Sequence, residues 1–411
     1  MSTTIEASNT SRMNATEIRA SVSLASIFGL RMLGLFLILP VFAVHAKSMP
    51  GGDSATLVGL ALGMYGLTQA FGQIPFGVAS DKFGRKRIII IGLVLFAIGS
   101  LIAAGADHII WIIVGRAVQG AGAVSAAVTA LIADSTRDEH RTKAMALVGA
   151  SIGLTYAASL VISPLLYHAI GMSGMFLLVA VLSVLAIGVV IFIVPTAPPR
   201  SPETASFTQV LRDGELMRLN FGVFVLHAIQ MSMFVVLPGV LVQAAGLPLD
   251  QHWRIYLPVV LTSFVLMLPP IFIGEKRGVM KQVFVAAIAL LLLVEIGLYV
   301  ALSQALLPVA VVVGLLLAFF VAFNILEASQ PSLVSRLAPA GSRGAALGVY
   351  NTMQAIGLFC GGAGGGLLAQ HFGGPTVFIV GCLLSSAWLI IATTMKSLPR
   401  RSKTPQQTVQ A

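Results

Sequence analysis

The sequence predicts an all-α polytopic membrane protein, with twelve transmembrane helices arranged as two pseudo-symmetric bundles of six. The first observation is composition: 57% of the 411 residues are hydrophobic and only 10% are charged, whereas about a quarter of the residues in a soluble domain are charged. The second is the length of the apolar runs. The mean hydropathy is +0.94, and one apolar run after another reaches the roughly 20 residues that a helix needs to cross a bilayer.

The third observation is the distribution of basic residues. All but four of the 25 Lys and Arg residues fall in seven stretches separated by enough apolar sequence to cross the membrane out and back: Arg12 and Arg19, Lys82 to Arg87, Arg137 to Lys143, Arg200 to Arg218, Lys276 to Lys281, Arg336 and Arg343, and Lys396 to Lys403. The intervening short loops contain Lys47 and Arg254. Basic residues collect on the cytoplasmic side. We therefore expect a multi-pass protein of the cell inner (cytoplasmic) membrane with both termini in the cytoplasm.

Other partners and processing are not indicated. The net charge of +10 is spread over several loops instead of one patch, so we expect no nucleic acid binding. Cys360 and Cys382 lie in apolar segments, which argues against a disulfide framework. Residues 1–18 lack an apolar signal core, and the first apolar run carries Arg31 and Pro40, so we interpret it as a retained helix.

The expected elements follow in order along the chain. The twelve helices are predicted at roughly 20–44, 55–80, 87–105, 108–134, 142–167, 173–194, 217–244, 253–273, 280–301, 305–335, 343–370 and 375–395. A proline-rich, charged linker divides them. The predicted domains are a cytoplasmic tail (1–19), a first six-helix bundle (20–194), a cytoplasmic linker (195–216), a second bundle (217–395) and a second cytoplasmic tail (396–411).

The two halves share short sequence matches at offsets near 200. Phe36-Leu-Ile-Leu-Pro40 returns as Phe234-Val-Val-Leu-Pro238, and Asp81-Lys82 with Gly84 returns as Glu275-Lys276 with Gly278. Each match is weak alone. In order, they indicate parallel repeats of the kind that build alternating-access transporters.

Polar pairs three or four residues apart lie on one face of several helices: Gln69 and Gln73, Arg116 and Gln119, His227 and Gln230, Asn324 and Glu327, Asn351 and Gln354. Such groups are costly in hydrocarbon, so they should face a cavity or form hydrogen bonds between helices. We expect a substrate cavity lined by Arg31, Phe36, Gln69, Gln119, His227, Gln230, Asn324, Asn351 and Gln354.

One loop carries a specific motif. Gly77-Val-Ala-Ser-Asp81-Lys-Phe-Gly84-Arg85-Lys86-Arg87 joins the second and third helices and resembles the signature loop of the major facilitator superfamily. Gly115-Arg116-Ala-Val-Gln119-Gly120-Ala-Gly122 resembles a second motif of that family. Together with Arg31 to Gly34 and Asp134, these residues are most similar to the YajR-type branch of the drug:proton antiporter group. The resemblance implies the twelve-helix fold and a transport function.

The signature loop is expected to act as a latch. A carboxylate at Asp81 can pair with Arg85 or cap a helix N-terminus. The resemblance implies that Asp81 faces the start of helix 11 near Ser342 and that Arg85 reaches Asp134. The latch residues would be Gly77, Asp81, Gly84, Arg85, Lys86 and Asp134, and the latch would favour an outward-open state. Alternatively, the basic residues only set topology, which leaves Asp81 and the two glycines unexplained.

Four ionisable residues lie deep within the predicted helices: Arg31, Arg116, Glu295 and Glu327. Each charge at mid-bilayer costs roughly 2.5–3.5 kcal/mol, so each should have a partner or a use. We assign proton coupling to Glu327, because desolvation favours the neutral form of a carboxyl group, and to Arg116, which would either tune a nearby acid or attract an anionic substrate; Arg31 could do either. A static ion pair is the alternative. Glu295 lies on a peripheral helix and is expected to be a packing residue; His227 could titrate, bind substrate or simply pack.

These observations predict a secondary active transporter that exports small amphipathic organic solutes or drugs in exchange for protons by alternating access. The fifth helix lacks the expected Gly-Pro antiporter motif and has Ser163-Pro164-Leu165-Leu166 instead. That departure and the two buried arginines leave open a uniporter or proton symporter for an anionic nutrient or metabolite; a non-transport membrane subunit is more distant. No metal-ligand cluster, nucleophile motif or phosphate-binding loop occurs in the sequence, so we expect no enzyme activity, metal or cofactor. The expected partners are a small-molecule substrate, protons and the lipid bilayer, and the chain is expected to be a monomer.

Overall fold

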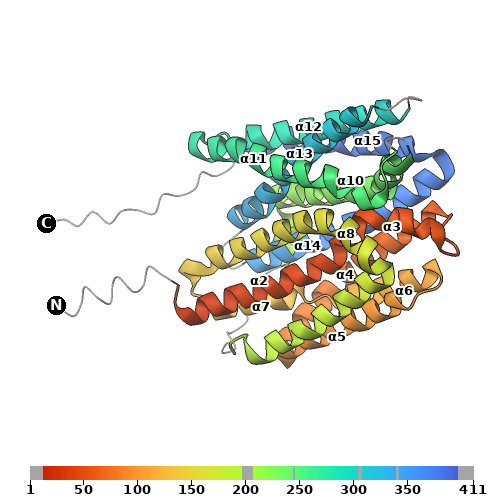
Figure 1. The fold of residues 1–411 in the computed structure, drawn as a ribbon. Helices are drawn as coiled ribbons and strands as arrows, with labels where there is room; N and C mark the ends of the chain where they lie inside the picture. The colour runs from red at the N-terminus through yellow and green to blue at the C-terminus, as the bar shows by residue number, and fades with distance from the viewer. Residues whose placement is uncertain (1–12, 197–206, 244–245, 304–307, 339–341, 397–411) are drawn as a thin grey trace, which may run out of the picture.

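The computed structural model describes residues 13–196, 207–243, 246–303, 308–338 and 342–396. The predictions for residues 1–12, for residues 197–206 of the linker and for residues 397–411 lie outside these residues. Every regular element in the described part of the chain is helical (Figure 1): α2 (Ala15–Phe36), α3 (Leu39–His45), η1 (Ala46–Ser48), α4 (Ala55–Phe83), α5 (Arg85–Ala104), α6 (Ile109–Ala121), α7 (Ser125–Ser135), α8 (Asp138–Phe192), α9 (Phe207–Arg212), α10 (Gly214–Gln243), η2 (Leu249–Gln251), α11 (Trp253–Arg277), α12 (Met280–Leu302), α13 (Val309–Leu337), α14 (Arg343–Phe372) and α15 (Gly374–Thr393).

The described residues include 11 helical segments that are long and apolar enough to cross a membrane. One of them holds two of the predicted helices, 142–167 and 173–194, because α8 continues through 55 residues and bends at Gly171 (φ 65°, ψ −178°). At 1.5 Å per residue, α8 is more than twice as long as the roughly 30 Å hydrocarbon core, so it supplies two crossings. The predicted all-α, polytopic fold is confirmed.

Two predicted helices are each broken into two elements. The first crossing is interrupted at Leu37 and Ile38, just before Pro40. Proline has no backbone N–H and its ring clashes with the preceding turn. The carbonyl of Leu37 is left outside the helical pattern and accepts a 2.5 Å hydrogen bond from Ser163 Oγ of α8, which satisfies a polar group inside the membrane. The fourth crossing is broken between α6 and α7, at 122–124.

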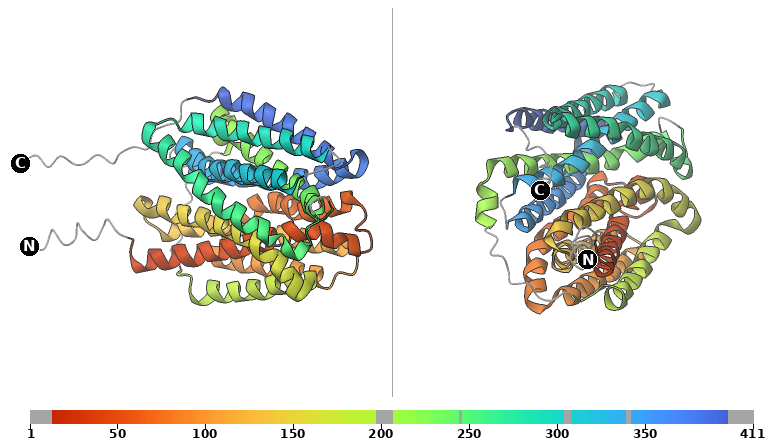
Figure 2. Two further views of the ribbon diagram at one scale, coloured as in Figure 1. Left: turned by 45° about the horizontal axis from the view of Figure 1, so that its top comes forward. Right: turned by 90° about the vertical axis from the view of Figure 1, so that its left-hand side faces the viewer.

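The helices before and after the linker form separate groups that meet mainly between α4 and α14, with smaller contacts of α10 with α3 and α4 and of α11 with α8 (Figures 1 and 2). The contact between α4 and α14 is backbone to backbone. A Cβ atom on Gly59 would lie 2.1 Å from the carbonyl oxygen of Gly362, and one on Gly362 would lie 2.6 Å from that of Gly59. Only glycine permits this approach. Gln370, near the end of α14, accepts a 2.6 Å hydrogen bond from the N–H of Ala55, the first residue of α4.

Side-chain contacts tie several helix ends together at the opposite end of the molecule, which we call the basic end because the basic stretches lie there. Lys281 of α12 donates to the carbonyl of Thr393 in α15. Arg137, which precedes α8, donates from its Nε to the Oε1 atom of Glu17 in α2, at 3.0 Å. The start of α2 and the end of α15 therefore lie at the same end, as Figure 1 also shows.

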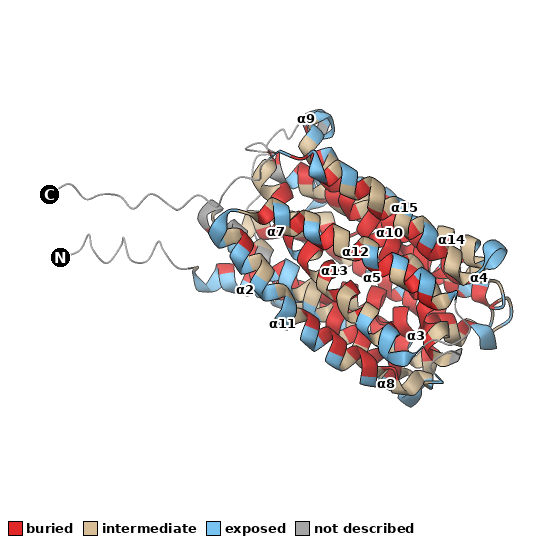
Figure 3. Ribbon diagram, turned by 90° about the horizontal axis from the view of Figure 1, so that it is seen from above, coloured by how far each residue is buried: buried red, intermediate tan, exposed pale blue. Residues whose placement is uncertain are grey.

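Buried residues concentrate where helices face one another, and exposed residues follow the outer faces (Figure 3). Large apolar side chains on the outside include Phe192, Phe272 and Ile390, which are 82%, 67% and 67% exposed. Such side chains are unfavourable in water and favourable against lipid tails. The outer surface thus suits a bilayer, and the polar residues described next lie inside it.

Candidate transport site and latch

The first group of helices buries two arginines around one tyrosine. The guanidinium carbon of Arg31 (α2) lies 5.5 Å from the ring centroid of Tyr65 (α4), and that of Arg116 (α6) lies 4.8 Å from it. All three side chains are completely or almost completely buried. Arg31 Nη1 donates a 2.5 Å hydrogen bond to Ser125 Oγ in α7. The arrangement joins the centres of α2, α4, α6 and α7 through cation–π and hydrogen-bond contacts.

Arg116 and Gln119 belong to a hydrogen-bonded chain inside the first group. Arg116 Nη1 donates to the carbonyl of Gly34 (3.2 Å) and to Gln119 Oε1 (2.9 Å), and Gln119 Nε2 donates to Ser100 Oγ on α5 (2.7 Å). These bonds connect α2, α5 and α6. Gln119 was expected to line the cavity, but here it is fully buried and directed at a neighbouring helix. Arg116, assigned with Glu327 to proton coupling, contacts residues of its own half.

The second group brings three predicted residues together. His227 Nε2 (α10) lies 2.7 Å from Gln354 Nε2 (α14) and 3.6 Å from Glu327 Oε2 (α13). His227 Nδ1 lies 2.9 Å from the carbonyl of Val223. The carbonyl can only accept, so Nδ1 carries the hydrogen and Nε2 accepts from the Gln354 amide. In this tautomer, Glu327 Oε2 has no hydrogen-bond partner in the described structure.

Glu327 differs from the buried arginines because 22% of its side chain is exposed. The ring of Phe323, one turn before Glu327 on α13, lies 5.4 Å from that of the buried Tyr156 (α8) and 5.9 Å from that of His227 (α10). The carboxyl group therefore lies between α8, α10, α13 and α14, from both halves of the molecule. Its Oε2 atom is buried at this junction, although part of the side chain is exposed.

The remaining predicted cavity residues lie in three different surroundings. Asn324 Nδ2 donates a 3.0 Å hydrogen bond to Ser263 Oγ on α11, which is the interhelical bonding left open as an alternative. Gln69 and Gln230 are buried; the Oε1 atom of Gln69 has no hydrogen-bond partner in the described structure, and the side chain of Gln230 lies beside the Tyr156 hydroxyl. Asn351, on the same helix as Gln354, is partly exposed.

Aromatic side chains connect the two halves at the centre. Tyr156 of α8 packs edge-on against Phe36 of α2 at 4.8 Å between ring centroids, and its ring lies 5.4 Å from Phe323 and 6.1 Å from Phe320 of α13. The ring of Phe323 lies 5.9 Å from that of His227. Phe36 thus reaches the centre as predicted, and an apolar, aromatic surface adjoins the polar group formed by His227, Glu327 and Gln354.

The expected latch is partly formed. Arg85 Nε lies 3.0 Å from Asp134 Oδ2, Arg85 Nη1 donates to Ser80 Oγ at 2.7 Å, and Arg85 also pairs with Asp81. Gly84 has φ 96°, a conformation that favours glycine, and lets α5 begin at Arg85 directly after α4. Gly77 lies near Ala126 of α7, and Lys86 is partly exposed.

One expected latch contact is absent. Asp81 was expected to face Ser342 at the start of α14, but among the described residues its interaction is with Arg85, and 55% of its side chain is exposed. The reason lies in the packing of α4 on α14. The two helices touch from Ala55 and Gly59 through Gly66, which faces Ala355, whereas Cβ atoms on Gly344 and Gly348 would meet nothing within 4 Å. The halves are closed at the end opposite the basic end.

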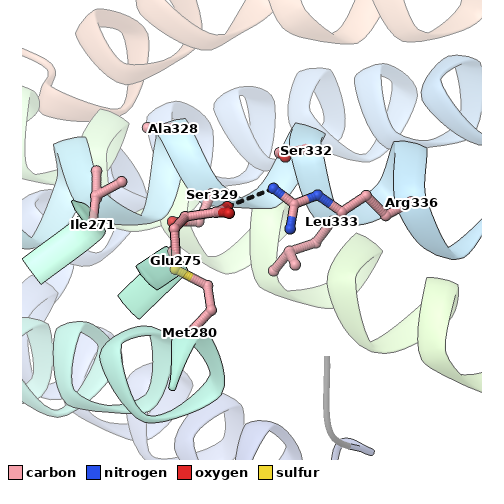
Figure 4. Close-up of a pocket in the computed structure, with 8 residues that line it drawn as sticks. All are labelled: Ile271, Glu275, Met280, Ala328, Ser329, Ser332, Leu333 and Arg336. Atoms are coloured by element: carbon pink, nitrogen blue, oxygen red, sulfur yellow. Dashed lines mark hydrogen bonds and ion pairs between the residues drawn. The ribbon is translucent and has the colours of Figure 1, made fainter. Parts of the chain in front are cut away.

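The second half has its own ion pair at the basic end (Figure 4). Arg336 Nη2 of α13 lies 2.5 Å from Glu275 Oε1 of α11. The pair borders a small pocket of about 40 Å³ lined also by Ser329, Ser332 and Met280, among others. Glu275 belongs to the segment that repeats the signature loop, so the repeat seen in the sequence coincides with a similar ionic connection between neighbouring helices.

Three tyrosines were missed by the sequence analysis. Tyr65 and Tyr350 lie four residues before Gln69 and Gln354, so each shares a helical face with a predicted cavity residue; that spacing could have identified them. Tyr156 has no such neighbour. Glu295 was expected to be a packing residue: it is buried on α12, where its Oε2 would lie 2.0 Å from a Cβ atom on Gly381 of α15.

Comparisons with known proteins agree with this architecture. The family model described as Major Facilitator Superfamily matches residues 22–362. The chain is 44% identical over 397 residues to the inner membrane transport protein YajR of Escherichia coli (strain K12), covering 95% of this chain and 86% of YajR. It is 28% identical to the multidrug resistance protein MdtH of Aeromonas salmonicida (strain A449), covering 83% of this chain and 85% of MdtH.

A solved structure has the same fold. It is a bacterial homologue of the human lysosomal transporter Spinster in an inward-facing, occupied conformation, with a TM-score of 0.73 at 13% identity, covering 95% of this chain and all of that one. The family match extends over most of the sequence, and the alignment with YajR covers nearly the whole length of this chain. This multi-pass membrane protein is a transporter that belongs to the major facilitator superfamily.

Proposed function

We propose that this transporter exports small amphipathic organic solutes in exchange for protons. The observation that carries the proposal is the position of Glu327. Its side chain is partly exposed at the junction of the halves, and its carboxyl group lies 3.6 Å from the His227 nitrogen that is hydrogen-bonded to Gln354. A carboxyl group in this position can be neutral, which desolvation favours, or charged, which His227 or solvent stabilises.

The imidazole can alternate between two partners. Neutral His227 accepts a hydrogen bond from Gln354 through Nε2. Protonated His227 carries a hydrogen on Nε2, can no longer accept from the Nε2 group of Gln354, and can donate to Glu327 instead. A proton arriving at this pair therefore changes the contacts between α10, α13 and α14. Because α14 also packs against α4 of the other half, this change reaches the contact that closes the end opposite the basic end.

The surroundings favour an amphipathic organic solute. Phe36, Tyr156, Phe320 and Phe323 provide aromatic surface next to few polar groups, which is typical of small-molecule sites. The relative MdtH is named a multidrug resistance protein, and this supports the same solute class here. The two buried arginines favour the second candidate, a uniporter or proton symporter for an anionic nutrient or metabolite.

The proposal also assigns orientation and moving parts. The basic end faces the cytoplasm of the inner membrane, following the distribution of basic residues. Residues 20–194 and 217–395 move as two bundles within one monomer, and the glycine contact of α4 with α14 is assigned to the closure of the periplasmic side. Asp81, Arg85 and Asp134 form the latch of the opposite, outward-open state once α14 approaches Asp81.

Flux in proteoliposomes tests the proposal. Purified protein is reconstituted and loaded with a fluorescent amphipathic solute, and flux is followed with and without an imposed pH gradient. Exchange with protons predicts uphill solute movement towards the acidic side. Movement of solute together with protons supports a symporter, and solute flux that ignores the gradient supports a uniporter; either result overturns proton-coupled export.

A further inference from the structure

The membrane core of the first half contains two cationic side chains that have no acidic partner among the described side chains. Arg31 and Arg116 are 1% and 0% exposed and lie against the same ring, Tyr65. Both guanidinium groups keep their charge under physiological conditions. Isolated buried charges are strongly destabilising unless they are paired.

The protein satisfies only one side of each guanidinium group. In the described structure, both arginines donate hydrogen bonds from Nη1, to Ser125 for Arg31 and to Gly34 and Gln119 for Arg116. The Nε and Nη2 atoms of both arginines and the hydroxyl of Tyr65 are buried and have no hydrogen-bond partner in the described structure. Five donor atoms around one ring are therefore held in place and left unused.

The acidic residues of the described first half do not supply the missing charge. Glu17 binds Arg137, and Asp81 and Asp134 bind Arg85, all at the basic end. Asp53 and Asp107 lie in the short loops at the other end. The acceptors that Arg31 and Arg116 do use are a hydroxyl, a carbonyl and an amide, which carry no net charge.

We propose that Arg31, Tyr65 and Arg116 form a binding site for a small monovalent anion, either chloride or the carboxylate of an organic acid. Guanidinium N–H groups and a phenolic O–H are donors suited to both ligands. Ser125 and Gln119 orient the two guanidinium groups through their Nη1 atoms, which leaves the other edges for the ligand. The site lies in one half of the molecule and does not depend on the direction of transport or on proton coupling.

Thermal unfolding of the full-length protein in detergent tests the site. Sodium gluconate, whose anion is large, is replaced at constant ionic strength by sodium chloride or by sodium benzoate. We expect a saturable rise in the unfolding midpoint with one or both anions, because a ligand that binds the folded state stabilises it. A rise in the midpoint with chloride identifies an inorganic ion as the ligand. A rise with benzoate alone identifies the head group of an organic solute.

Variants locate the effect. Arg31→Gln and Arg116→Gln should raise the half-maximal anion concentration at least tenfold, and Tyr65→Phe should raise it by a smaller factor. Arg254→Gln is the matched control, since Arg254 stacks on Trp253 outside this cluster, and it should keep the wild-type response. The proposal is overturned if neither anion changes the wild-type midpoint, or if both arginine variants respond to the anion as the wild type does.

A second measurement needs no variant. Crystals of the wild-type protein are grown with bromide or 4-iodobenzoate, whichever class of anion raises the midpoint. The proposal predicts an anomalous peak within hydrogen-bond reach of Arg31 and Arg116 for bromide, or an iodine peak adjoining a carboxylate there. A peak elsewhere, with this position empty, contradicts it even if the arginine variants fail to fold.

Discussion

The Nε2 atom of His227 lies 3.6 Å from the Oε2 atom of Glu327. The same nitrogen lies 2.7 Å from the amide of Gln354, so it serves one partner at a time. Three helices of the second half meet at this atom, and Tyr156 brings α8 of the first half close to the carboxyl group. The proposed coupling depends on this competition between Gln354 and Glu327 for one ring nitrogen.

Replacing His227 by glutamine should weaken coupling without removing it. Glutamine can bond to Gln354 but cannot take up a proton, so Glu327 loses its ionisable neighbour and keeps Tyr156 and Tyr350 nearby. Hydrogen bonds to charged groups contribute about 1.5–3 kcal/mol, so we expect gradient-driven flux to fall about tenfold or more. His45→Gln, which alters a histidine bonded to Tyr167, is the control. Equal gradient-driven flux in both variants would remove His227 from the mechanism.

Asp81→Asn should shift the protein towards states that are open at the basic end. Exposed ion pairs contribute about 0–1 kcal/mol, and Arg85 keeps Asp134, so insertion and folding should be normal. Transport should fall because the outward-open latch loses its carboxylate. Cysteine labelling at the two ends, in a Cys360→Ser, Cys382→Ser background, measures the shift. Lys82→Gln, which removes a basic charge from the same loop, is the control. If labelling and flux in Asp81→Asn stay at wild-type values, the loop serves only to set topology.

A side chain at Gly362 should open the α4–α14 contact. A Cβ atom there would lie 2.6 Å from the Gly59 carbonyl, and overpacking costs about 1–3 kcal/mol. Gly362→Val should therefore increase labelling of a cysteine at Leu57. Gly364→Val is a matched control on the same helix, because a Cβ atom on Gly364 meets nothing within 4 Å. The assignment of this contact as the periplasmic closure fails if both variants label alike.

Glu17→Gln should destabilise the protein more than it affects transport. Glu17 Oε1 accepts from the backbone N–H and Nε of Arg137, and Oε2 lies 3.0 Å from Nη2. Glutamine keeps one acceptor and loses the charge, so we expect the free energy of unfolding to fall by about 2 kcal/mol. Thermal unfolding compared with the exposed Asp53→Asn measures it. A midpoint equal to that of the control would show that the Glu17–Arg137 contact contributes little.

The features that sequence predicted well depend on neighbours along the chain. Hydropathy and basic residues predicted the helices, and the spacing of Asp81 and Arg85 predicted an ion pair one helical turn long. The approach of Arg85 to Asp134 followed from the family resemblance. Breaks near Leu37 and at 122–124 were not predicted, although Pro40 was visible, because a proline can also bend a helix without ending it.

Contacts between helices were harder to predict, since they depend on relative depth and rotation. Sequence placed Arg31 and Arg116 within helices but could not place Tyr65 between them. It grouped Arg116 with Glu327, whereas Arg116 bonds to Gly34 and Gln119 in its own half. Asp81 was assigned to Ser342, a contact that requires a different arrangement of α4 on α14 from the one seen here.

The most direct test of coupling through Glu327 is the ratio of gradient-driven to equilibrative solute flux in reconstituted protein. Glutamine at position 327 keeps the size and hydrogen-bonding capacity of glutamate but cannot ionise. We predict that Glu327→Gln abolishes uphill movement and retains equilibrative exchange, while Glu295→Gln, the buried carboxyl group on α12, keeps the wild-type ratio. A Glu327→Gln protein that still concentrates solute at the wild-type ratio would contradict the account.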